Sequence, residues 1–113
     1  MDCIFCKIIA DEIPGNFDYK GEEIVAFRDI QPVSPIHILI VPRKHIVSLN
    51  DLKDNELSLI GQMVKVAKEL AVKEGIAEKG YRLTINCGKE GSQLVPHLHM
   101  HLLGGRQLSG RIG

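Results

Sequence analysis

The sequence predicts a single α+β domain, with a mostly antiparallel sheet of about five strands, a short N-terminal helix and one long central helix. Several runs of apolar and β-branched residues alternate with a period of two, as in strands. Only one long stretch, after residue 54, repeats its apolar residues with a helical period. A chain of 113 residues suits one modest core, so residues 1–113 are interpreted as one domain.

The N-terminal stretch CIFCKIIADEIPG predicts a short amphipathic helix. Its isoleucines recur at roughly helical spacing, and the Pro-Gly pair at 14–15 is expected to stop the helix. Cys3 and Cys6 form a Cys-x-x-Cys pair in this stretch. The chain has 3 cysteines, an odd number, which argues against a disulfide framework and leaves metal ligation or redox chemistry for this pair.

The predicted strands follow this helix in two groups, which the long helix separates. The stretch EEIVAFRDI places Val25, Phe27 and Asp29 on one face, and a turn at Gly21 connects it to the preceding NFDYK. The stretch PIHILIVP is almost wholly apolar between two prolines, which predicts a strand buried on both faces. The main strand-like runs are 22–30, 35–42, 80–88 and 96–105.

One long helix is predicted from Asp54 to Gly75. Apolar residues recur there at a spacing near 3.6, and Gly75 is placed to end the helix. The apolar stripe comprises Leu57, Ile60, Val64, Ala67 and Ala71.

Charge and composition favour small-molecule partners. The 14 basic residues balance 14 acidic residues, so no net field attracts nucleic acid or an anionic membrane. We therefore expect no nucleic acid and no membrane partner. The N-terminal residues contain no apolar run of the length that a signal peptide or membrane span needs, so we expect a cytoplasmic location.

Three of the five histidines, His97, His99 and His101, lie two residues apart in PHLHMHLLGG. In a strand they would share one face at intervals of about 6.6 Å. Zinc needs each nitrogen within about 2.1 Å, so two neighbours can share an ion whereas all three do not converge. Imidazole can ligate a metal or act on a phosphoryl group, and two imidazoles with Cys3 and Cys6 would complete a structural Cys2His2 site.

The run HLHMHLL resembles the His-x-His-x-His-x-x signature of the histidine triad family of nucleotidyl hydrolases and transferases. The stretches CIFCKII, IVAFRDI, HILIVP, GYRLTINCG and GGRQ extend the resemblance over nearly the whole chain, to the purine nucleoside phosphoramidase branch. The resemblance implies a histidine triad fold and a homodimer. It also implies hydrolysis of a purine nucleoside monophosphate from a phosphoramidate or related leaving group through a covalent nucleotidyl-histidine.

The resemblance also assigns residues to this reaction. His99 matches the nucleophile, His101 matches the residue that contacts the phosphate and assists the leaving group, and Asp29 matches the carboxylate that accepts the ribose hydroxyls. For His99 to attack through one nitrogen, the other must donate its proton to a fixed acceptor such as a backbone carbonyl. The base slot matches Ile4, Phe5, Ile8 and Phe27. The surroundings of the phosphate match Asn86, Gln93, Leu94 and Val95.

Structural zinc is implied by the same resemblance, as in many prokaryotic members. Its ligands match Cys3, Cys6, His45 and His97. His97 would then bind the metal while His99 stays free. His37 matches a family histidine near this cluster, and it is equally consistent with a hydrogen-bonded core residue.

Two departures keep alternatives open. Leu94 stands where this branch commonly has a Ser or Thr that helps to protonate the leaving nitrogen, and the tail lacks the Trp-Pro-Pro ending that is common there. A zinc-stabilised nucleotide-binding protein with little turnover is therefore the first alternative. The second is a metallohydrolase that uses the triad as catalytic ligands. The third, the dinucleoside polyphosphate hydrolase branch, is disfavoured by the long helix and GGRQ.

Overall fold

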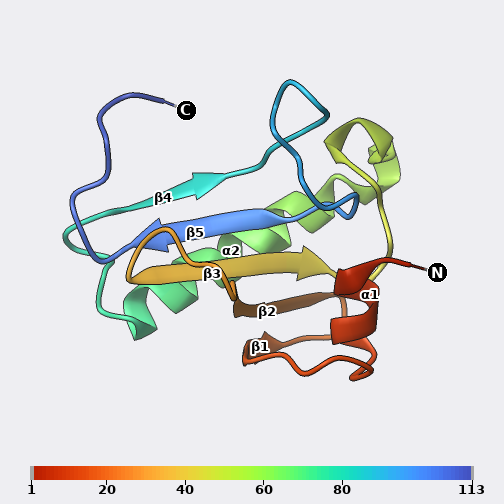
Figure 1. The fold of residues 1–113 in the computed structure, drawn as a ribbon, viewed down its shortest axis with the longest axis horizontal. Helices are drawn as coiled ribbons and strands as arrows, with labels where there is room; N and C mark the ends of the chain where they lie inside the picture. Colours follow the sequence, from red (N-terminus) through yellow and green to blue (C-terminus); the bar gives the residue numbers. More distant parts are fainter. Residues whose placement is uncertain (1, 113) are drawn as a thin grey trace.

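The computed structural model describes residues 2–112 and has two α-helices and five strands in the described chain (Figure 1). It confirms the predicted α+β class with one short and one long helix. None of the helices in this described part combines the length and hydropathy that a membrane span requires. The elements are α1 (Ile4–Ile9), β1 (Phe17–Lys20), β2 (Ile24–Arg28), β3 (Ile36–Pro42), α2 (Ser58–Lys73), β4 (Tyr81–Thr84) and β5 (Met100–Gly104).

The five strands form one sheet in the order β1-β2-β3-β5-β4. Every neighbouring pair is antiparallel, which confirms and sharpens the predicted mostly antiparallel sheet. β3 occupies the centre, and six of its seven residues are buried, as expected for an apolar strand between two layers.

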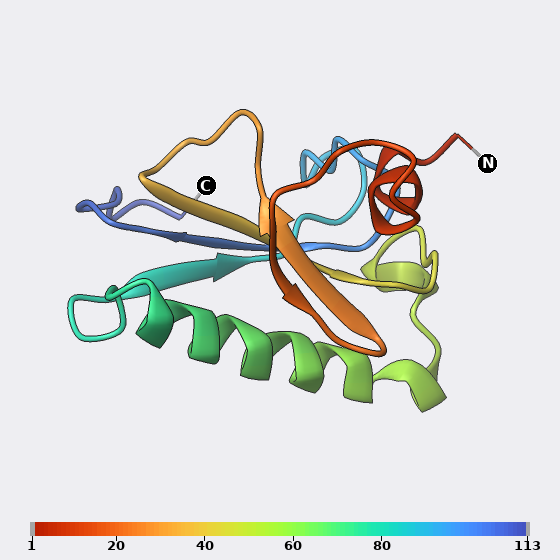
Figure 2. The same cartoon turned by 90° about the horizontal axis from the view of Figure 1, so that it is seen from below.

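The two faces of the sheet pack against different helices (Figure 2). On one face, Ile24 and Ala26 of β2 join the core that includes α2. On the other, Val25 and Phe27 join the smaller cluster that includes α1. The predicted alternation of β2 is therefore confirmed, because successive side chains of a strand point to opposite faces.

α2 ends close to the glycine that was predicted to stop it, whereas α1 ends earlier than predicted. α2 ends at Lys73, and Gly75 adopts a left-handed φ of 74° just beyond it. α1 ends at Ile9, well before the predicted stop at 14–15. The cause is local: Asp11 adopts a left-handed φ of 60°, and the Glu12 N–H donates to the Lys7 carbonyl, which turns the chain out of the helix.

The last two strands are shorter than predicted. β4 ends at Thr84 and β5 begins at Met100, so His97 and His99 lie immediately before β5 and only His101 lies on it. Leu98 donates its N–H to the Ile46 carbonyl at 2.7 Å, outside the sheet ladder. The alternation nevertheless persists. Leu98, Met100 and Leu102 are buried in the core beneath α2, and the histidines face the other side.

Candidate functional site

A cavity of about 1010 Å³ lies on the face of the sheet opposite α2. This volume is at the upper end of the range for small-molecule pockets. Residues far apart in the sequence meet there because α1, the end of β2, the loop before β5 and β5 itself share this face. Ten of the predicted site residues line the cavity: Ile4, Phe5, Ile8, Phe27, Asp29, Asn86, Leu94, Val95, His99 and His101.

One ring nitrogen of His99 is unprotonated, and its lone pair is available to the pocket. Its Nδ1 lies 2.7 Å from the main-chain carbonyl oxygen of His97. A carbonyl oxygen only accepts, so Nδ1 carries the proton and donates it. Burial lowers the pKa of His99, which keeps the ring neutral near pH 7. Nε2 is therefore unprotonated, and it has no hydrogen-bond partner among residues 2–112.

His101 is in the opposite tautomer to His99, because a chain of hydrogen bonds places its proton on Nε2. The Val33 N–H donates to Nδ1 of His37 at 3.1 Å, so a neutral His37 carries its proton on Nε2. That Nε2 lies 2.9 Å from Nδ1 of His101 and 3.4 Å from Oδ2 of Asp29. Nδ1 of His101 accepts, and its own proton is on Nε2. The register explains the contact, because His37 and His101 are diagonal neighbours on β3 and β5.

The site therefore holds two adjacent neutral imidazoles with complementary functions. The ring centroids of His99 and His101 are 5.0 Å apart. His99 offers a lone pair that can attack, and His101 offers an N–H that can bind an anionic oxygen or protonate a leaving group. This pairing suits nucleophilic displacement at phosphorus.

The pocket lacks an uncommitted cation among the residues that the structure describes. Arg28 is the single Lys or Arg side chain among its described lining residues, and it binds Asp18 at 2.9 Å and Glu74 at 2.6 Å. Without a free cation, the donors available to an anion there are neutral: the N–H of His101, the Ser92 hydroxyl and main-chain N–H groups. Those of Leu94 and Val95 have no described hydrogen-bond partner, and both residues line the pocket. This electrostatic environment favours a singly charged phosphate over a polyphosphate.

The two predicted amide side chains hold the loop that precedes β5. Asn86 lines the pocket and donates from Nδ2 to the Gly91 carbonyl at 2.8 Å. Gln93 does not line it. Its Nε2 donates to the Val47 and Val95 carbonyls, at 2.7 and 3.0 Å, and its Oε1 accepts from the main chain. A contact between Gln93 and phosphate thus stays a prediction, whereas its observed contacts shape the loop.

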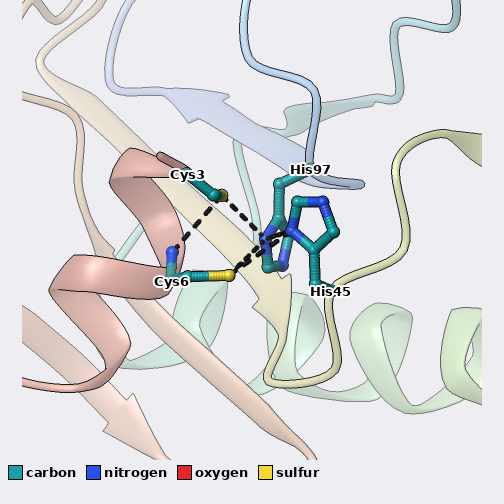
Figure 3. A group of neighbouring side chains, drawn as sticks. All are labelled: Cys3, Cys6, His45 and His97. Carbon is teal, nitrogen blue, oxygen red and sulfur yellow. Dashed lines mark hydrogen bonds between the residues drawn. The ribbon is translucent and has the colours of Figure 1, made fainter. Parts of the chain in front are cut away.

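A second cluster, which we name the Cys2His2 cluster, comprises Cys3, Cys6, His45 and His97 (Figure 3). Nδ1 of His97 lies 3.3 Å from Sγ of Cys3, 3.6 Å from Sγ of Cys6 and 3.2 Å from Nδ1 of His45. Ideal tetrahedral zinc, with bonds of about 2.1 Å to nitrogen and 2.3 Å to sulfur, would separate nitrogens by about 3.4 Å and nitrogen from sulfur by about 3.6 Å. The four donors therefore fit the edges of a zinc tetrahedron.

Proton positions in the Cys2His2 cluster also suit a cation. Nε2 of His97 lies 2.8 Å from the Pro42 carbonyl oxygen and must donate to it, so Nδ1 directs a bare lone pair into the cluster. Burial lowers the pKa of His97 to about 4, which keeps this ligand neutral. Without a cation, burial and the neighbouring Cys3 raise the pKa of Cys6 to about 11. A bound metal would reverse that preference and favour the thiolate.

The group formed by Asp29, His37 and His101 is equally compact, but its protons are placed differently. Its ligand atoms also lie within 4.8 Å of one another. However, the Val33 N–H occupies the lone pair on Nδ1 of His37, which puts a proton on the nitrogen that would have to bind metal. The hydrogen bonds therefore disfavour the alternative in which the triad row supplies catalytic metal ligands.

The structure adds pocket residues that sequence reasoning missed. Most of them belong to the turn after α1 and to the loop between β2 and β3, and the others lie on strands of the sheet or in the loop between β4 and β5. The position of Asp29 at the end of a predicted strand was a signal for the second group, since the loop that follows it must border the same site. The additional lining residues are Pro14, Gly15, Asn16, Ile30, Gln31, Val33, Leu39, Thr84, Ser92 and Leu103.

The buried histidines predict that the fold loses stability in acid. Burial lowers the pKa of His101 from 6.5 to about 4. Between these values the unfolded chain takes up a proton that the native chain does not, so the free energy of unfolding falls as the pH drops. Urea unfolding at about pH 7 and about pH 5 measures this fall. His101→Gln should show a smaller fall, and an equal fall in both proteins would contradict the assignment.

Comparisons with known proteins agree with this geometry. The family model described as "HIT domain" matches residues 10–108. The chain is 49% identical over 107 residues to the purine nucleoside phosphoramidase of Escherichia coli strain K12, an alignment that covers 95% of this chain and 90% of that protein.

Solved structures share the fold as well as the sequence. A HIT family hydrolase from Legionella pneumophila superposes with a TM-score of 0.96 at 46% identity, covering 99% of this chain and 100% of that one. A Zn-bound histidine triad family protein from Mycobacterium smegmatis gives a TM-score of 0.83 at 30% identity, covering 98% and 82% of the two chains. The resemblance seen in the sequence is confirmed, and the chain belongs to the HIT, or histidine triad, family.

Proposed function

We propose that this chain is a nucleotide hydrolase that releases a purine nucleoside monophosphate from phosphoramidates or related conjugates through a covalent intermediate on His99. The observation that carries the proposal is the 2.7 Å contact between Nδ1 of His99 and the His97 carbonyl, which leaves Nε2 as a lone pair at the pocket. The purine nucleoside phosphoramidase of E. coli, 49% identical, supports the substrate class.

In the proposed reaction, Nε2 of His99 forms a bond to the α-phosphorus while the bond from phosphorus to the leaving nitrogen breaks. The electron pair of that bond stays with the nitrogen, which takes a proton from Nε2 of His101. Water then attacks the phosphorus, its hydroxyl stays there, and its other proton returns to His101. The bond to His99 breaks and its lone pair is restored, which divides one difficult displacement into two easier steps.

The remaining predicted contacts would position the nucleotide. Asp29 would accept the ribose hydroxyls. The main-chain N–H groups of Leu94 and Val95 would hold phosphate oxygens, as preorganised donors in an oxyanion site do. The apolar walls from α1 and Phe27 would hold the base, because buried ring surface is favourable against apolar side chains.

Structural zinc in the Cys2His2 cluster is part of the proposal. The donor separations and the bare lone pair of His97 support it, and so does the Zn-bound M. smegmatis neighbour. Such a closed four-ligand site would add stability and supply no reactive water. The ion would join α1 to the segment before β5, two parts of the chain that are about 90 residues apart.

We also place this function in a cytoplasmic homodimer. The outer edge of β4 is unpaired in the described chain, and an open edge is a ready site for a second copy. Leu57 and Val72, beside and on α2, are exposed apolar side chains that a second copy packed on this helix would cover. The metal-ligating arrangement of Cys3 and Cys6 fits a reducing compartment, where cysteines are kept as thiols. Native mass spectrometry tests the dimer directly, and a monomer at micromolar concentration would contradict it.

Steady-state release of AMP from adenosine 5′-phosphoramidate tests the enzyme against the alternative, a nucleotide-binding protein with little turnover. We expect AMP to be released. Chelation of zinc should lower the rate of release far less than substitution of His99 does. Tight binding of AMP without release from the phosphoramidate would instead establish the binding protein.

The observation that favours the alternative is Leu94. Its side chain is 90% exposed at the pocket and has no hydroxyl to help protonate a leaving nitrogen. We therefore expect Leu94→Ser to raise kcat for an alkylamine phosphoramidate by about tenfold, within the range of one added proton donor. A matched ester with a good leaving group needs no such proton, so its kcat should change little. Equal changes for both substrates would contradict this role for position 94.

A further inference from the structure

The Cys2His2 cluster and the nucleophile share residues, and this connection suggests more than a stabilising role for the cluster. His97 contributes its ring to the cluster and its main-chain carbonyl to Nδ1 of His99. The carbonyl determines which nitrogen of His99 carries the proton. A movement of the His97 main chain therefore alters the hydrogen bond that keeps the attacking nitrogen unprotonated.

Phe5 makes a second connection between the same two groups. Its ring meets the ring of His99 edge to face, with centroids 5.1 Å apart and planes at 85°. It also meets the ring of His97 at 5.8 Å. Phe5 is 6% exposed, so it has little freedom to move while α1 stays in place.

α1 is attached to the sheet by its apolar packing and also by the contacts of its cysteines with the Cys2His2 cluster. The helix has six residues, too few to be stable alone. Cys3 caps its first turn, accepting the Cys6 N–H on Sγ at 3.4 Å, and both cysteines contact the cluster histidines (Figure 3). Phe5 lies between these two cysteines in the sequence. Fixing their sulfur atoms therefore fixes the ring that packs on His99.

We propose that the Cys2His2 cluster orients the nucleophile, and that Phe5 is a positioning residue for His99. The metal-filled cluster holds His97 and α1, and these hold His99 through a carbonyl and a ring. This inference rests on the proposed function only for its kinetic consequence. The orientation and the proton position of His99 are properties of the protein without nucleotide.

The deciding sample is zinc-loaded Phe5→Leu, compared with the zinc-loaded parent. Correlation spectra of the ¹⁵N-labelled histidine rings, recorded near neutral pH without nucleotide, distinguish Nδ1–H from Nε2–H forms. The signals that disappear from the spectrum of His99→Gln are assigned to His99. We expect one Nδ1–H form in the parent and a mixture in Phe5→Leu at equal zinc content. The parent after chelation of zinc should show the same mixture.

A kinetic comparison separates positioning from base binding. We expect Phe5→Leu to lower kcat by about tenfold, the scale of lost support for a reacting group. A residue that only lined the base slot would raise KM and leave kcat and the His99 spectrum unchanged. Phe17→Leu is the matched control, because Phe17 packs on Phe27 and not on His99, and it should keep the parent's kcat and spectrum.

Two results would overturn the inference. One is a parent-like spectrum of His99 in zinc-loaded Phe5→Leu. The other is a single Nδ1–H form that persists after zinc is removed from the parent. Failure of the proposed function looks different, since it is the absence of AMP release by the zinc-loaded parent. The spectra would still decide whether Phe5 and the cluster orient His99.

Discussion

His99→Ala should abolish AMP release from adenosine 5′-phosphoramidate, with kcat reduced by at least about a thousandfold, while AMP binding is retained. The expected size follows from covalent catalysis, in which loss of the nucleophile removes both steps together. His99 supplies the unprotonated imidazole nitrogen at the pocket, because Nδ1 donates to the His97 carbonyl. Intact-protein mass spectrometry after rapid mixing should show an adenylyl adduct on the parent and none on the variant.

His101→Gln is the matched control for this experiment. It removes the neighbouring imidazole but leaves the nucleophile and its hydrogen bond to His97, so the adduct should still form, more slowly. Zinc content should be equal in all three proteins, which separates chemistry from folding. An adduct of the same mass on His99→Ala would contradict the assignment of the nucleophile.

Local sequence patterns predicted most of the fold because each face of the sheet has its own apolar partner. Val25 and Phe27 alternate with Ile24 and Ala26, and the two sets pack on opposite sides of β2 as the pattern indicates. The helical period of α2 was also clear, but its predicted stripe was only partly right. Ala67 and Ala71 are buried as predicted, whereas Leu57 lies outside the helix and is exposed, and the rest of the buried side is Leu59, Met63, Val66 and Leu70. These elements depend on neighbouring residues, which a sequence displays directly.

The segment before β5 could not be predicted from alternation alone. Leu98 alternates like a strand residue, yet its N–H pairs with the carbonyl of Ile46 in the segment that follows β3. That hydrogen bond joins residues far apart in the sequence, and no local pattern encodes it. His97 and His99 consequently leave the ladder, and this departure directs the His97 carbonyl to the ring of its neighbour.

The site shows the same division between local and long-range information. The sequence predicted that the second nitrogen of His99 needs a fixed acceptor, but the structure was needed to identify the His97 carbonyl. The sequence allowed two interpretations of His37, as a core residue or as a residue of the site, and it has features of both. It is 5% exposed, and it connects Val33 to His101 through its two nitrogens. Its register opposite β5 decides this, and register is a long-range property.

Cys3→Ser should remove zinc binding and lower the free energy of unfolding by about 3 kcal/mol or more, the scale of a lost structural metal. Serine is a better helix N-cap than cysteine, so loss of the cap on α1 cannot explain such a fall. Cys87→Ser makes the same chemical change at a half-buried cysteine outside the cluster, and should keep both zinc and stability close to those of the parent.

Chelation separates the metal from the side chain in the same experiment. Removing zinc should bring the parent down to the stability of Cys3→Ser and leave that variant unchanged, because a ligand stabilises only the protein that binds it. Urea unfolding with and without chelator, together with metal analysis, gives all four values. If Cys3→Ser retained the parent's zinc, or if chelation destabilised both proteins equally, Cys3 would not be a ligand. The stability of α1 would then have to come from the packing of Phe5 and Ile8 alone.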